Sequence, residues 1–557
     1  MGYDLIIKKG RIVDGTGNPW FYADIGIKAG RIVRIGSLDA CEAVRILKAE
    51  GYVVAPGFID IHSHSDFAII SNPMAESKVK QGVTTEVNGN CGSSAGPLAP
   101  GHERYGDPSH GCQEGEGLRW KSLGDYFSLL EKMGISINIA SLVGHGTIRS
   151  CVMGSENRKP TVEELDRMRS LVHKSMMDGA LGLSSGLDKG LIPGCYADTE
   201  ELIELCKVVA RYGGFYATHQ RNRQERVLEA AMEAIEIGEK AQVPVQISHF
   251  VPRFPDGNKT LECMGIIEAA RRRGIDVTCD VVVPNAFGGY HWAHGSLATQ
   301  VLPLWAYEGG RERLLERLRD PETRRRMRRE AEPLWGVWRH GLWDNLILLE
   351  SHGSPHLVGK TFEEIAKEKG VDPWEASYDI LLEEGGRSCG ILGASTEERD
   401  SIMVMKYPWS SLESDRALHV PHGPSVSASS STSSQAQAQA SAPSKERADA
   451  NAYGAFPRIF RRYVRELGIL TLEEAVRKVT SLPAQRCGFR DRGILKEGFW
   501  ADIVIFSVDR IADRATIEEP TRFPEGIDYV IVNGRIVVEG GEHTGAKPGK
   551  VLRRSYL

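Results

Sequence analysis

An apolar run leads directly into a His-Ser-His triplet in the segment Ala55-Pro56-Gly57-Phe58-Ile59-Asp60-Ile61-His62-Ser63-His64-Ser65-Asp66. On a strand, residues i and i+2 face the same side. We therefore expect His62 and His64 to project together from the carboxyl end of a strand, where parallel barrels carry their active sites. Imidazole is a good ligand for Zn²⁺, Fe²⁺ or Mn²⁺. The alternative is a pair of ordinary loop histidines.

Short β-strand patterns separated by Gly turns fill residues 1–56, and residues 482–557 show the same pattern. Over residues 57–481, apolar strands alternate with helical stretches, which favours βα units and a parallel sheet. The predicted fold is α/β: a (β/α)8 TIM-like barrel at 57–481, with a small β-sandwich domain built from both chain termini. The helical stretches are 161–178, 199–211, 225–240 and 260–273.

Two segments interrupt this alternation. Residues 284–345 hold an aromatic loop and a highly basic helix, Arg311–Arg329, and are too long for an ordinary βα loop. They predict either a lid over the barrel mouth or a solvated peripheral insertion. Residues 425–444 form a Ser/Ala/Gln tract with nothing to bury, which is typical of a mobile linker or an engineered graft.

The composition excludes several classes of protein. The 557 residues are 41% hydrophobic and 26% charged, the balance of an ordinary globular protein and not of a collagen, a coiled coil or a wholly disordered chain. The net charge of −5 supplies no broad field to attract nucleic acid or an anionic membrane. No apolar run reaches the ~18 residues of a membrane span. We therefore expect neither nucleic acid nor membrane as a partner.

The cysteines and the N-terminus bear on the compartment. The ten cysteines are scattered and include no Cys-x-x-Cys pair. The first residues are typical of a strand and a turn, and not of a signal peptide. Because thiols stay reduced inside cells, we expect a cytoplasmic protein without disulfides.

Three more predicted strand ends supply candidate metal ligands. The β-rich segment 83–90 stops at Cys91, where a thiolate would be a soft ligand that favours zinc. His219 and His249 each follow a short apolar run. Each of these residues alone is more often structural. Their recurrence at successive strand ends predicts that they point inward together.

An acid stands at the end of the last predicted strand of the central region, in Ser410-Ser411-Leu412-Glu413-Ser414-Asp415. A carboxylate at that position and close to a divalent cation stays ionised, so Asp415 can serve as a ligand and as a general base. Glu413 is a chemical competitor that would lie deeper. An ordinary structural acid is the alternative.

Together these segments resemble the amidohydrolase superfamily, and within it the N-acyl-D-amino-acid deacylases, or D-aminoacylases. The resemblance covers nearly the whole chain, and Asn90-Cys91-Gly92 separates these enzymes from members that bridge their metals with a carboxylated lysine. The matching stretches are DLIIKKGRIVDGTG, PGFIDIHSHSD, GVTTEVNGNCG, SLVGHGTIR, GALGLSSGL, ATHQRN, ISHF, YGAFPRIFRRYVRE and KEGFWADIVIF.

The resemblance implies a zinc enzyme that hydrolyses a non-peptide C–N amide bond, most like N-acyl-D-amino-acid deacylation. Metal-bound hydroxide would attack the carbonyl, with Asp415 as general base and then general acid. One Zn²⁺ would be tightly bound, and a second position would be weaker. The tight site would use Cys91, His219 and His249, and the weaker one His62, His64 and Asp415, with Cys91 as a bridge.

Parts of the family's carboxylate-binding pattern are absent. The family has a Lys shortly after the sixth-strand His, a Tyr-rich loop after the seventh strand and an Arg before the YGTFPR-like segment. In the deacylases these groups hold the substrate's α-carboxylate. Here His249 is followed by Phe250-Val251-Pro252-Arg253, without the Lys. Because a carboxylate in a dry pocket needs a cation or several donors, Arg253 and Arg416 become candidate replacements.

Further residues are candidates for lining the substrate pocket. His145 follows another strand and matches the family, either as a lining residue or as a packed one. Tyr290, with Phe287, His291 and Trp292, would form either an aromatic pocket for a neutral cyclic amide or the small core of the insertion.

Two alternatives to a deacylase remain open. The absence of the family's carboxylate-binding residues favours a cyclic amidase of hydantoinase, imidase or dihydroorotase type that uses the same metals. A degenerate homologue that binds without catalysis is the other alternative, and the intact ligand set argues against it. The expected partner is a small-molecule amide. The acyl group, the D or L preference and a homo-oligomeric state stay undetermined by the sequence.

Overall fold

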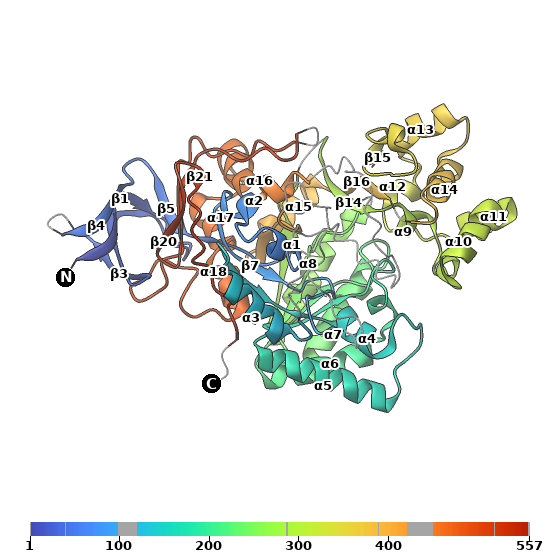
Figure 1. Ribbon diagram of the computed structural model, residues 1–557, viewed down its shortest axis with the longest axis horizontal. Helices are drawn as coiled ribbons and strands as arrows, with labels where there is room; N and C mark the ends of the chain where they lie inside the picture. The colour runs from blue at the N-terminus through green and yellow to red at the C-terminus, as the bar shows by residue number, and fades with distance from the viewer. Residues whose placement is uncertain are drawn as a thin grey trace.

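The computed structural model describes residues 2–38, 41–98, 120–254, 256–285, 288–387, 389–419, 449–516 and 519–554. The tract at 425–444 and Phe287 therefore lie outside the described residues. The protein is mixed α/β, as predicted. Figure 1 shows a sheet that contains strands from the N-terminal and C-terminal segments, a central α/β region and a largely helical insertion at the opposite end. Among the described residues, no helix has both the length and the apolar character needed to cross a membrane.

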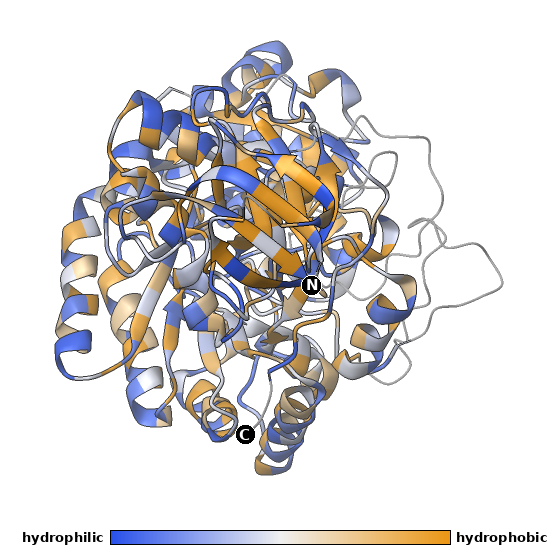
Figure 2. Ribbon diagram, turned by 90° about the vertical axis from the view of Figure 1, so that its left-hand side faces the viewer, coloured by the Kyte–Doolittle hydropathy of each residue, from blue (hydrophilic) through white to orange (hydrophobic). Residues whose placement is uncertain are grey.

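Strands from the N-terminal and C-terminal segments share one sheet. β5 (Val53–Pro56) pairs antiparallel with β18 (Ile503–Phe506), which joins the N-terminal strands to the C-terminal ones. Hydrophobic residues concentrate on these strands, as Figure 2 shows from this end of the molecule, and they pack into a core of their own. The sheet order is β21-β20-β19-β18-β5-β1-β2-β3, with β4 paired to β1. The remaining strands are β1 (Tyr3–Ile12), β2 (Phe21–Lys28), β3 (Arg31–Gly36), β4 (Ala43–Lys48), β19 (Ile527–Val532), β20 (Arg535–Glu539) and β21 (Glu542–His543).

Two parallel sheets form the centre of the molecule, in the orders β6-β7-β8 and β17-β13-β12-β11-β10-β9. Only Leu142 separates β8 from β9, and Ser63, beyond β6, forms a parallel bridge with Arg416, beyond β17. Their residues are almost all buried, as expected of parallel strands covered on both faces. The strands are β6 (Phe58–Asp60), β7 (Val83–Asn88), β8 (Asn138–Ser141), β9 (Val143–Gly144), β10 (Gly182–Gly186), β11 (Phe215–His219), β12 (Val245–Ile247), β13 (Val277–Val282) and β17 (Ser410–Glu413).

Helices follow the central strands and pack on them. Thr161 and Glu164 form a reciprocal capping box that begins α5 (Val162–Asp178), and Gly179, with a positive φ, ends it. The four predicted helices are present, with ends within two residues of those expected. The other helices of this region are α1 (Ala68–Ser71), α2 (Glu76–Val79), α3 (Leu123–Met133), α4 (His145–Met153), α6 (Thr199–Arg211), α7 (Val227–Ala241), α8 (Thr260–Arg272), α15 (Glu398–Met405), α16 (Asn451–Arg458), α17 (Leu472–Lys478) and α18 (Ser481–Cys487).

The insertion has its own antiparallel sheet and its own core. β14 (Tyr290–Ser296) pairs with β16 (Gly390–Glu397), so this sheet joins residues on both sides of position 345, where the predicted insertion ends. A tryptophan-rich cluster fills its interior, apart from the core of the central region. Its other elements are β15 (Leu346–Leu348), α9 (Leu297–Val301), α10 (Gly310–Arg319), α11 (Pro321–Glu330), α12 (Gly336–Arg339), α13 (Phe362–Lys369) and α14 (Pro373–Glu383).

The basic stretch of the insertion forms two helices, α10 and α11, where the sequence predicts one. The chain breaks at Asp320, which caps α11, because Pro321 has no N–H with which to continue α10. Part of the positive charge is paired inside the insertion: Arg324 Nη1 lies 2.9 Å from Glu375 Oε2 and 2.8 Å from Asp379 Oδ1, both on α14.

Candidate metal centre

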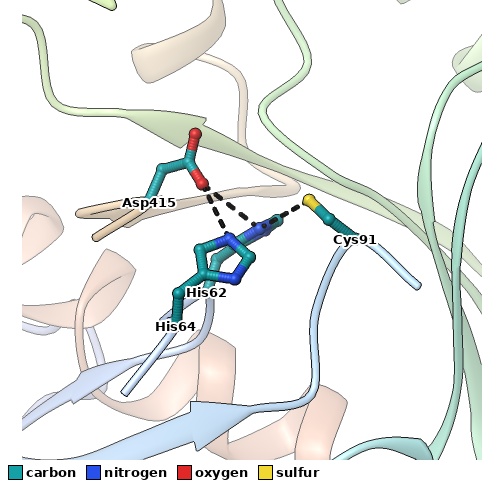
Figure 3. A group of neighbouring side chains, drawn as sticks. All are labelled: His62, His64, Cys91 and Asp415. Atoms are coloured by element: carbon teal, nitrogen blue, oxygen red, sulfur yellow. Dashed lines mark hydrogen bonds and ion pairs between the residues drawn. The ribbon is translucent and has the colours of Figure 1, made fainter. Parts of the chain in front are cut away.

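His62 and His64 lie just beyond β6, which ends at Asp60. Parallel pairing resumes at the bridge between Ser63 and Arg416, so Ser63 lies between the two histidines in a paired segment. Because residues on either side of a paired one face the same way, both imidazoles point to one side, with ring centroids 5.3 Å apart (Figure 3).

Two glycines position the segment that carries Cys91. Gly89 and Gly92 both have positive φ. A Cβ at Gly89 would lie 2.1 Å from Leu142 O, and one at Gly92 would lie 2.6 Å from Gly186 N, so no larger residue fits at either position. The backbone can therefore pass close to the ends of the neighbouring strands, and the thiol lies beside the other candidate ligands.

Three candidate ligands have a left-handed backbone conformation that side-chain-bearing residues rarely adopt. The φ angle is +50° at Cys91, +36° at His249 and +50° at Asp415. Such conformations cost roughly 1–3 kcal/mol each and persist where the surroundings impose them. Their occurrence beyond β7, β12 and β17 is typical of a functional site, where strain aims side chains at a common point.

The Cys91 thiol is the point at which the candidate ligands meet. Its Sγ lies 3.3 Å from His62 Nε2, 3.5 Å from His219 Nδ1 and 3.5 Å from His249 Nε2. Two groups of potential ligand atoms share this sulfur, each with all its atoms within 4.8 Å of one another. One group is Cys91, His219 and His249, and the other is His62, His64, Cys91 and Asp415.

Asp415 and Glu413 lie in opposite electrostatic environments. Asp415 Oδ1 is 3.1 Å from His64 Nε2 and 3.5 Å from His62 Nε2 (Figure 3). Burial would raise the pKa of the Asp415 carboxyl, but these imidazoles hold it well below its usual value. Glu413 is fully buried without a hydrogen-bond partner for either carboxylate oxygen, and burial raises its pKa well above the usual value. Of the two acids, Asp415 is therefore the one whose surroundings favour the ionised form.

Two further acids lie beside the candidate ligands, and the sequence argument did not identify either. Asp188 Oδ2 lies 3.4 Å from His219 Nε2 and also accepts a hydrogen bond of 2.8 Å from Arg253 Nη1. Asp280 Oδ1 lies 3.6 Å from His62 Nδ1. Carboxylates commonly hold the second nitrogen of metal-binding histidines. The available signal was positional: Asp280 lies within the seventh strand, and Asp188 lies two residues beyond β10.

The donor set fits zinc. Thiolate and imidazole are the ligands that zinc prefers in proteins. Burial would raise the pKa of the Cys91 thiol, but His62, His219 and His249 hold it well below its usual value. The thiol is thus poised as a thiolate, the form in which cysteine binds metals.

Two of the predicted pocket residues lie outside both groups of ligand atoms. His145 is fully buried and its Nε2 lies 2.8 Å from Glu201 Oε1, which occupies that nitrogen. Tyr290 is half-buried on β14 and packs edge-on against Phe254, with ring centroids 5.1 Å apart. Its neighbour Trp292 belongs to the core of the insertion.

Comparison with known proteins places this chain in a family. The model of the amidohydrolase family matches residues 45–279 and 444–538. A D-aminoacylase of Alcaligenes xylosoxydans xylosoxydans is 33% identical over 554 residues, which cover 99% of this chain and 98% of the relative.

Two solved structures extend the similarity to the fold. An N-acyl-D-glutamate deacylase from Bordetella bronchiseptica, complexed with zinc and a phosphonate inhibitor, is 30% identical with a TM-score of 0.78, covering 99% of this chain and 100% of that one. A D-aminoacylase described for its binuclear metal centre is 31% identical with a TM-score of 0.78 and the same coverage. The chain therefore belongs to the amidohydrolase family, among the N-acyl-D-amino-acid deacylases.

Proposed function

We propose that this protein is a zinc-dependent enzyme that hydrolyses the non-peptide amide bond of N-acyl-D-amino acids. One observation carries the proposal: the Cys91 sulfur lies within 3.5 Å of three imidazole nitrogens from three separate strand ends. The relatives support the class of substrate and the metal, since they include a D-aminoacylase and a zinc-bound N-acyl-D-glutamate deacylase.

The chain offers ligands for one tight zinc and for a second, weaker position. When bound, zinc supplies a Lewis acid that polarises the amide carbonyl and lowers the pKa of a water molecule. The binuclear centre described for a D-aminoacylase relative supports a second position. We assign Cys91, His219 and His249 to the tight site, and His62, His64 and Asp415 to the weaker one, with Cys91 shared.

Asp415 is the residue we assign to proton transfer. Its carboxylate is ionised and borders the ligand cluster, so it can accept a proton from the attacking water and then deliver it to the leaving amine. Transfer of this kind contributes roughly 10²- to 10⁴-fold to the rate. Glu413 does not suit this role, because its carboxyl is fully buried and burial raises its pKa well above the usual value.

The sheet connections support a closed barrel behind this site. Within the described residues, the two parallel sheets join through Leu142 and through the bridge between Ser63 and Arg416, which would close a (β/α)8 ring. We propose this barrel for residues 57–481 and a β-sandwich domain for residues 1–56 and 482–557. The insertion that begins near position 284 would then border the barrel mouth, where it could act as a lid.

A panel of substrates tests the proposed function. Purified enzyme is assayed against N-acetyl-D-amino acids, their L counterparts and cyclic amides such as hydantoins and imides, with zinc measured by atomic absorption. We expect bound zinc and turnover of the D-acyl series. Turnover of cyclic amides alone would identify a cyclic amidase. Absence of bound zinc and of all turnover would identify a non-catalytic homologue.

Two cysteine variants, one at a candidate ligand and one as a control, test the metal assignment. Cys91→Ala should reduce the zinc content and abolish turnover, because the variant removes the sulfur that both groups share. Cys151→Ala is the matched control, since that thiol is half-buried on α4 and outside both groups. The control should keep its zinc and its activity, and a fully active Cys91→Ala enzyme would refute the assignment.

A further inference from the structure

Most of the basic side chains near the candidate metal centre lie beside an acid of the protein. Arg253 pairs with Asp188 at 2.8 Å, and Arg416 pairs with Asp449. Lys189 is mostly buried beside Asp188, and burial lowers its pKa to about 8, so it stays largely protonated at neutral pH with that acid as its neighbour. The two arginines suggested by the sequence for the substrate carboxylate are therefore each held by an acid of the protein itself.

Arg223 is different because it has no acidic partner. It lies in the loop beyond β11 and is 7% exposed. Its Nε and Nη2 both donate to Val251 O, at 3.3 and 2.9 Å, and it forms no ion pair with any described residue. A guanidinium has five N–H donors, so most of its capacity is unused. Its Nη1 makes no hydrogen bond and is not fully enclosed.

The charge of Arg223 acts on the candidate metal centre. Burial and the neighbouring Arg253 lower the pKa of Arg223 itself to about 10, while Asp415, Asp188 and Cys91 oppose that change. The guanidinium therefore lies within electrostatic reach of the ligands and of Asp415, and it stays charged at neutral pH.

Arg223 also contacts the loop in which the family's carboxylate-binding lysine is missing. The loop after His249 lacks a lysine, and Arg223 donates to the main chain of that very loop, at Val251. The main-chain N–H of Arg253 in turn donates to Arg223 O, at 2.7 Å. The loops that carry His219 and His249 are thereby tied together, with an uncompensated cation between them.

We propose that Arg223 receives the free carboxylate of the substrate, and that this contact makes N-acyl amino acids, and not neutral amides, the substrate class of this enzyme. The inference rests on the proposed function and deepens it. A planar guanidinium with unused donors matches a carboxylate in geometry and charge. Burial strengthens such an ion pair. Because a buried guanidinium without an anion is unfavourable, the site favours a substrate that carries a carboxylate.

The experiment compares each N-acetyl-D-amino acid with its carboxamide, in which the same acetyl bond is cleaved but the carboxylate is neutral. We measure kcat/KM for both in the wild type, in Arg223→Gln and in Arg223→Lys. The ratio of carboxylate to carboxamide activity should fall on the order of 10- to 100-fold in Arg223→Gln, the range expected for losing a charged hydrogen bond. Arg223→Lys should restore part of it.

The controls separate recognition from structure. Arg226→Gln removes an exposed cation from the same loop and should leave the ratio unchanged. A purely structural role for Arg223 would lower both activities equally and leave the ratio at its wild-type value, which would overturn the inference while the deacylase function stands. A wild-type enzyme that cleaves neither compound would overturn the proposed function, and this inference with it.

Discussion

At the scale of residues, the candidate centre depends on one shared atom. Each donor could be recognised in the sequence, because all of them stand at the ends of predicted strands: His62, His64, Cys91, His219, His249 and Asp415. The acids that lie beside these ligands could not be recognised in the same way. Nothing in the local pattern indicates that Asp188 reaches His219, since the pairing arises only when the loops after β10 and β11 lie side by side.

The role of Asp188 gives a prediction at this scale. Asp188→Asn keeps the shape of the side chain but removes the charge that orients His219 and balances Arg253. Zinc affinity should fall about 10- to 100-fold, the usual effect of losing such a partner. Competition with a calibrated zinc chelator measures it. Asp166→Asn, at an exposed acid on α5, is the control, and equal affinities in the two variants would contradict this role.

At the scale of elements, α2 connects the first and last strands of the central sheets. Lys78 is fully buried on this short helix. Its Nζ lies 2.8 Å from Asp60 Oδ2 and 3.0 Å from Glu86 Oε1, and it donates to Ser414 Oγ at 2.8 Å. The sequence indicates the strands themselves, but the ion cluster that joins β6, β7 and the end of β17 forms only in the folded chain.

Removing this lysine should destabilise the protein strongly. Lys78→Met conserves most of the volume but leaves Asp60 and Glu86 buried without a counter-ion, which typically costs about 3–5 kcal/mol. Denaturant unfolding followed by circular dichroism should show a clearly lower midpoint. Lys132→Met, at an exposed position on α3, should change the midpoint little. An unaltered midpoint in Lys78→Met would show that the cluster contributes no net stability.

At the scale of the whole molecule, the metal should link the strand ends that surround the centre. The candidate ligands lie at or just beyond the ends of β6, β7, β11, β12 and β17, so a bound ion stabilises the folded state relative to the unfolded chain. Free zinc at 100 times its dissociation constant contributes about 2.7 kcal/mol. Protons compete with the metal for imidazole and thiolate, so this contribution should shrink as the pH falls.

Scanning calorimetry measures this effect. The unfolding temperature should rise with added zinc, fall after treatment with a chelator, and respond less to zinc at lower pH. In Cys91→Ala, the dependence on zinc should largely disappear. An unfolding temperature that is insensitive to zinc in the wild type would mean that the candidate ligands do not hold the ion.

The sequence by itself determined the mixed α/β class, the helices of the central region and the chemical nature of the ligands, because periodicity, helix caps and residue type are local properties. It also indicated a family whose members carry this centre. Only the tertiary structure decided which groups meet. Cys91 and His249 are 158 positions apart, and their 3.5 Å approach depends on strand order and on strained turns. The same long-range packing gave Arg253 and Arg416 acidic partners and left Arg223 without one, because pairing depends on neighbours in space and not along the chain.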